Sequence, residues 1–201
     1  MPHAAEPPLP GGSALAHAEA TLRSGARFLA AGLQAGAGVP APITGRFRAK
    51  VIGNGLRELD RFLNVLADEA AVAGGIRPAR SDRNTANKLR TLFPGQPAGE
   101  HDRLVALARA RACLFYCSGM VTRGDVRGSQ WLTVGWSDPG HAGRLRRFAV
   151  GAELAITSED VADICGFYVG IATRLRAMAG DASPSVQRSP SPPSPASSVP
   201  S

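Results

Sequence analysis

Apolar residues recur at alternating steps of three and four positions along three long stretches of the chain, 14–34, 46–73 and 158–179. In the middle stretch they occupy Ile52, Leu56, Leu59, Leu63, Leu66, Ala70 and Ala73. In the last stretch they occupy Val161, Ile164, Tyr168, Ile171, Leu175 and Met178. This spacing places the apolar residues on one side of a helix, so each stretch is expected to be an amphipathic helix of a bundle.

Small polar residues stand where the helices are expected to begin. Ser13 precedes the first helix and Thr157 precedes the last, and a hydroxyl at this position accepts a hydrogen bond from a free backbone N–H. Ser81 is the expected N-cap of a further, short helix. That helix should end before Pro94, because proline cannot continue the helical hydrogen bonds.

A fourth long helix is predicted over residues 101–121, and it contains the most informative residue of the chain. Its apolar stripe is formed by Leu104, Leu107, Leu114 and Val121. Arg111 lies in the middle of that stripe, where its charge needs a carboxylate partner or a wet cleft, unless it reaches water from the edge. Asp60 and Glu69 are expected on the outer face of their helix, and either could pair with Arg111 across the bundle.

The helical period is replaced by an alternating pattern after this helix. Residues 129–136 and 144–150 alternate apolar and polar side chains, and residues 137–143 between them are rich in turn-forming types. This pattern predicts a β-hairpin. Because an isolated hairpin is only marginally stable, it should pack against the helices.

These elements together predict a mostly α fold, a bundle of four or five helices with a β-hairpin inserted before the last helix. The single domain should span residues 13–180, with the hairpin at 129–150. Residues 1–12 are rich in proline and glycine, and residues 181–201 are rich in proline and serine. Both tails are expected to be disordered, because they have too little apolar surface to offset their conformational entropy.

The composition places limits on the partners and the compartment. The formal net charge is +7, and nearly all of the basic residues are arginine. Arginine is well suited to binding phosphate groups, but a high arginine content is also typical of proteins from GC-rich genomes. Three cysteines without a tight framework argue against a disulfide-stapled secreted domain. No apolar run is long enough for a signal peptide or a membrane span, so a cytoplasmic protein without membrane contact is expected.

Cys113 and Cys117 face the same side of the predicted fourth helix. A zinc site would need two more ligands, and the sequence offers only Cys165 and scattered histidines. The cysteines are therefore expected to be small, buried and inert, and neither a metal nor a cofactor is expected.

Five arginines after the fourth helix are the candidate nucleic-acid contacts: Arg123, Arg127, Arg144, Arg146 and Arg147. The first two belong to the basic loop TRGDVRG, and the other three stand on the predicted second strand near two tryptophans. A solvated edge strand would explain the strand arginines equally well.

The segment RACLFYCSGMVTRGD, residues 111–125, resembles the signature of HEPN-domain proteins, a family of compact helical bundles. Active members are metal-independent ribonucleases that act as dimers, in which an arginine and a histidine of each chain line one cleft. Arg111 matches the motif arginine, Ala112 stands where a polar residue is usual, and Tyr116 stands where the histidine would be. Tyrosine, with a pKa near 10, is a poor base for the proton of a ribose 2′-hydroxyl.

The resemblance therefore implies a non-catalytic HEPN-like module that dimerises and binds RNA or a partner. One alternative is an active metal-independent ribonuclease that uses Arg111 with Tyr116 or His101. A second alternative is a protein-interaction module without nucleic-acid binding.

Overall fold

The computed structural model describes residues 11–33, 41–77, 84–97 and 99–181, which form five helices and one hairpin. The elements are α1 (Gly11–Gly32), α2 (Arg46–Ala73), α3 (Thr85–Leu92), α4 (Glu100–Tyr116), β1 (Trp131–Asp138), β2 (His141–Ala149) and α5 (Ser158–Asp181). The predicted mostly α fold with a hairpin before the last helix is thus confirmed. Most of the two predicted tails, residues 1–10 and 182–201, lies outside the described residues.

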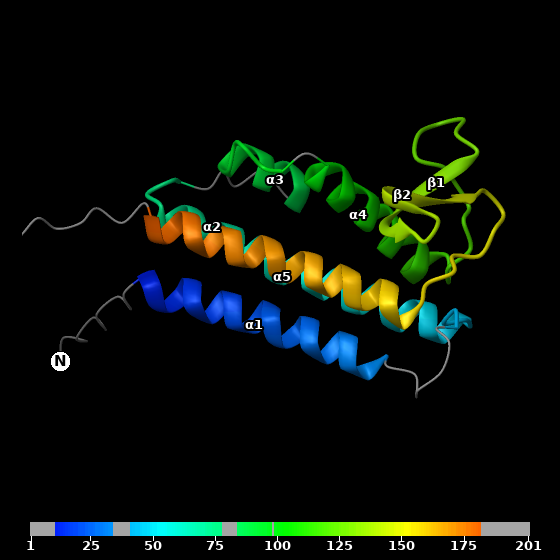
Figure 1. The fold of residues 1–201 in the computed structure, drawn as a ribbon, viewed down its shortest axis with the longest axis horizontal. Helices are drawn as coiled ribbons and strands as arrows, with labels where there is room; N and C mark the ends of the chain where they lie inside the picture. Colours follow the sequence, from blue (N-terminus) through cyan, green and yellow to red (C-terminus); the bar gives the residue numbers. More distant parts are fainter. Residues whose placement is uncertain (1–10, 34–40, 78–83, 98, 182–201) are drawn as a thin grey trace, which may run out of the picture.

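Helices α1, α2 and α5 pack against one another along their lengths, and α4 packs on α2 (Figure 1). The short α3 connects α2 to α4, and the hairpin lies on α4 and contacts α5. None of the helices in the described part of the chain combines the length and the apolar character needed to cross a lipid bilayer.

The predicted apolar stripes form the core. On α2 every member of the stripe is buried except Ala73, which is partly buried. On α5 the stripe is buried as far as Leu175, but Met178 is 44% exposed and Ala179 takes the inner position instead. Close packing of α2 on α4 needs glycine at Gly53, because a Cβ there would lie 2.8 Å from the backbone nitrogen of Phe115.

The helix starts were predicted with mixed success. Thr157 caps α5 as expected: the Asp160 N–H donates to Thr157 Oγ1 (3.1 Å), and the Thr157 N–H donates to Asp160 Oδ2 (2.9 Å). The cap of α3 is Asn84, whose side chain accepts from two backbone N–H groups, whereas the predicted cap Ser81 lies outside the described residues. The prediction for Ser13 was wrong, since α1 already begins at Gly11.

The predicted helix over 101–121 was too long, because α4 ends at Tyr116. Ser118 and Gly119 have positive φ angles of 54° and 88°, which no α-helix contains. Val121 is nevertheless buried, because backbone hydrogen bonds join it to the segment before α5: its N–H donates to Ala152 O and its carbonyl accepts from the Gly151 N–H.

The hairpin matches the predicted alternation. Trp131 pairs with Ala149 and Thr133 with Arg147. The side chains that face the helices are buried, namely Leu132, Val134 and Trp136. The predicted turn over 137–143 was too long, because β1 continues to Asp138 and β2 begins at His141.

Candidate functional site

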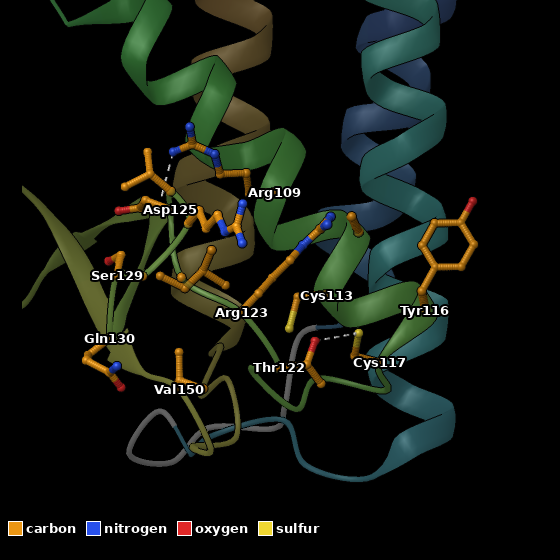
Figure 2. A pocket seen from close by; sticks show the side chains of 16 residues that line it. Arg109, Cys113, Tyr116, Cys117, Thr122, Arg123, Asp125, Ser129, Gln130 and Val150 are labelled. Carbon is orange, nitrogen blue, oxygen red and sulfur yellow. Dashed lines mark hydrogen bonds and ion pairs between the residues drawn. The ribbon is translucent and has the colours of Figure 1, made fainter.

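A cleft of about 880 Å³ opens between the last turns of α4 and the loop that leads to β1 (Figure 2). Helix α4 contributes Arg109, and the loop contributes Arg123 and Arg127. The cleft combines a concave shape with three guanidinium groups, so its chemistry is that of an anion site.

Asp125 holds the loop in place over the hairpin. Its Oδ1 accepts the Thr133 backbone N–H (2.9 Å), and its Oδ2 accepts the Thr133 hydroxyl (2.6 Å). Arg109 Nη1 also donates to Asp125 Oδ1 (3.2 Å), which ties the loop to α4. The loop also needs glycine at Gly124, because a Cβ there would collide with the backbone of Ser129. The arginines of the loop are thus carried on an anchored backbone.

The charges of the cleft are only partly compensated. Asp125 is the sole carboxylate among the described lining residues, and it already binds Arg109. Arg123 and Arg127 are exposed, and within the described residues neither has an ion-pair or hydrogen-bond partner. In Figure 2, Arg123 extends from the loop toward α4. Two guanidinium groups are therefore available to a ligand.

Of the two cysteines that line the cleft, Cys113 is buried and is not a reactive group, whereas Cys117, which was predicted to be buried, is only partly buried. Cys113 Sγ donates to the Met120 carbonyl (3.1 Å), and burial, followed by the neighbouring Cys117, raises the pKa of the Cys113 thiol to about 11. A thiol with that pKa is protonated at neutral pH and is a poor nucleophile. In the part of the chain that the structure describes, no group of three or more His, Cys, Asp or Glu side chains could hold a metal ion.

Arg111 is placed away from this cleft and faces α2. Its Nη1 lies 2.5 Å from Asp60 Oδ2, and that oxygen also accepts the Thr85 hydroxyl from α3 (3.0 Å). The contact between Arg111 and Asp60 is an ion pair, but its geometry is not that of a hydrogen bond, so the buried Arg111 Nη1 has no hydrogen-bond partner among the described residues. Of the two carboxylates considered as partners for Arg111, Asp60 is the one in contact.

Neither Tyr116 nor His101, the two residues considered to act with Arg111 in a ribonuclease, lies beside Arg111 in the structure. Tyr116 follows it by five residues, a rotation of about 140° around the helix; its side chain is 76% exposed, and it is among the residues that line the cleft, whereas Arg111 is not. His101 precedes Arg111 by ten residues, or about 15 Å along the axis, and its Nε2 lies 3.2 Å from Asn87 Oδ1. The predicted catalytic pairs are therefore not assembled within one described chain.

The three strand arginines have different environments. Arg146 Nη2 lies 3.1 Å from Asp160 Oδ1 and also donates to the Ser137 carbonyl, so it joins the hairpin to the start of α5. Arg144 and Arg147 are exposed. Arg147 pairs with Thr133 across the hairpin, which places it on the same face as the residue that anchors Asp125.

Sequence reasoning missed Arg109 and Asp125. Arg109 was not among the predicted site residues, and Asp125 was noted only as the end of the resembling segment. The pattern RGDVRG carried a usable signal, because a lone carboxylate among glycines and arginines often organises a loop by accepting backbone N–H groups.

Comparison with known proteins finds no matching family model, no matching curated protein and no matching solved structure.

Proposed function

We propose that this protein is a non-catalytic RNA-binding module and that its cleft binds RNA phosphates. The observation that supports the proposal is the pair Arg123 and Arg127, which line a concave site without partners among the described residues. Arginine forms bidentate hydrogen bonds with phosphate, and a chain of charge +7 attracts a polyanion over long distances. In this proposal the protein acts in the cytoplasm, and the resemblance to HEPN-domain proteins remains a prediction.

The absence of catalysis in this proposal follows from the chemistry of the lining. Cleavage at a ribose needs a group that transfers the 2′-hydroxyl proton near neutral pH. The described lining offers no histidine, and its buried Cys113 thiol has a pKa of about 11. A ribonuclease built on Arg111 would have to give up the ion pair with Asp60, so the catalytic alternative is the weaker one.

The test is RNA binding as a function of salt. A fluorescent single-stranded RNA is titrated with the purified chain, and log Kd is plotted against log salt concentration. Each arginine–phosphate contact contributes about 0.7 to the magnitude of the slope for a single strand, because it releases a counterion. Arg123→Ala combined with Arg127→Ala should therefore reduce the slope by about 1.4 and weaken binding at every salt concentration.

The matched control is the double variant Arg144→Ala and Arg147→Ala, which removes two exposed arginines of the hairpin and spares the structural Arg146. It should change the slope less than the cleft variant. A slope that the hairpin variant lowers as much as the cleft variant, or more, would overturn the assignment of the binding surface to the cleft, and a lack of binding at low salt would overturn the proposal. RNA cleavage in the presence of a chelator would instead favour the ribonuclease alternative.

A further inference from the structure

The outer face of α2 carries apolar side chains where a solvated helix would carry polar ones. Phe47 is 80% exposed, Val51 62%, Val65 47% and Val72 57%. The opposite face of the same helix holds the buried stripe and contacts α4 at Gly53. The exposed apolar residues therefore point away from the core and also from the cleft.

The spacing of these residues is that of a helix–helix seam. Val51, Val65 and Val72 are separated by multiples of seven positions, and Phe47 lies one turn before Val51. A period of seven keeps side chains on one stripe when two helices supercoil, and β-branched residues are common at such positions. The four residues span most of a helix of 28 residues, and Glu58 occupies the heptad position between Val51 and Val65.

The charges of α2 are arranged against its own macrodipole. Its first turn has no acidic residue and its last turn has no basic residue. Arg46, Arg48 and Lys50 stand near its amino end, whereas Glu69 stands near its carboxyl end. A helix dipole favours the reverse order, so this arrangement is unfavourable for α2 alone. Neither Arg48 nor Glu69 has an ion-pair or hydrogen-bond partner among the described residues.

We propose that this face is the interface of a homodimer in which the α2 helices of two copies pack antiparallel. The basic amino end of each helix then lies beside the acidic end of the other, with Arg48 of one copy near Glu69 of the second. The same alignment sets Phe47 against Val72 and Glu58 beside Arg61. A parallel pair in register would instead place Glu58 against Glu58, where like charges repel.

This interface differs from the one implied by the HEPN resemblance, in which the motif arginine lines a cleft shared by two chains. Arg111 packs on the inner side of α2 with Asp60, so it lies outside the proposed surface. Because the α2 face also lies outside the arginine-lined cleft, dimerisation and RNA binding can fail independently.

The first experiment is sedimentation velocity of the full chain over a wide range of concentration. The unmodified chain should show a concentration-dependent monomer–dimer equilibrium. Val65→Glu should raise the dissociation constant by about tenfold or more, since it places an unpaired carboxylate in the seam. Val126→Glu, at an exposed valine of the cleft loop, is the matched control and should leave the dimer unchanged. Circular dichroism checks that both variants are folded.

A charge swap tests the antiparallel alignment. Arg48→Glu and Glu69→Lys should each weaken the dimer, and both changes in one chain should restore it, because the pair is re-formed with inverted signs. A chain that stays monomeric at every concentration would overturn the proposal, as would a dimer indifferent to Val65→Glu. A double charge variant as weak as the single ones would overturn the antiparallel alignment.

Discussion

Two arginines of α4, only two residues apart, belong to two regions of different character. Arg111 points into the helical bundle and meets Asp60, which α3 also holds through Thr85. Arg109 points to the loop and meets Asp125, beside a cleft that carries further arginines. Both guanidinium groups have a carboxylate partner, but the first is enclosed by three helices and the second is attached to a loop.

The comparison shows that the carboxylate partner of an arginine can stabilise either the helical bundle, as Asp60 does, or the loop of the candidate site, as Asp125 does. The Arg111–Asp60 pair is the more enclosed, with side-chain exposures of 24% and 14%, against 40% and 18% for Arg109 and Asp125. Water therefore screens the Arg109 pair more effectively. We expect changes in the bundle to act mainly on global stability, and changes at the cleft loop to act mainly on local order and ligand binding.

The largest expected effect is that of Leu63→Ala in the bundle. Leu63 is fully buried in the stripe of α2, so its truncation should lower the free energy of unfolding by about 2–5 kcal/mol. Chemical denaturation measures the change. A loss below about 0.5 kcal/mol, the usual size of a surface effect, would contradict the assignment of this stripe to the core.

Arg111→Met should have an intermediate effect. It keeps the packing of the aliphatic stem but leaves the Asp60 carboxylate without its counter-ion. Because the pair is only partly enclosed, the loss should be about 1–3 kcal/mol, between the values for exposed and buried pairs.

The control for this prediction is Arg27→Met. Arg27 is exposed on α1 and has no ion-pair or hydrogen-bond partner among the described residues, so its change should be nearly neutral. Arg109, two residues away on the same helix, does not serve as a control, because it pairs with Asp125. Equal small losses for Arg111→Met and Arg27→Met would show that the Asp60 pair does not stabilise the bundle.

Thr133→Val should have the smallest effect on global stability. The substitution keeps a β-branched side chain in β1 and removes one hydrogen bond to Asp125, so unfolding should become easier by about 1 kcal/mol. Its main consequence should be local: amide hydrogen exchange over residues 122–130 should accelerate while that of α2 stays unchanged. Unaltered exchange in the loop would mean that Asp125 does not hold it.

The sequence by itself determined the helical stripes, the hairpin and the Thr157 cap of α5. Each depends on residues within one or two turns of each other: Leu63 is buried because its neighbours at steps of three and four are apolar. The capping box of Thr157 and Asp160 is likewise complete within four residues. Such short-range patterns can be recognised without knowing what lies across the fold.

Only the tertiary structure decided the end of α4, the partner of Arg111 and the cleft. Asp125 acquires its role from Thr133 in β1 and from Arg109, 16 residues earlier in the chain. Asp60 meets Arg111 where Gly53 lets α4 approach α2 closely, and Tyr116 lies on another side of α4, where its ring is exposed. These features depend on contacts between segments that are far apart in the sequence. Periodicity along one helix predicts the direction in which a side chain points, but it does not predict which residue of another segment that side chain contacts.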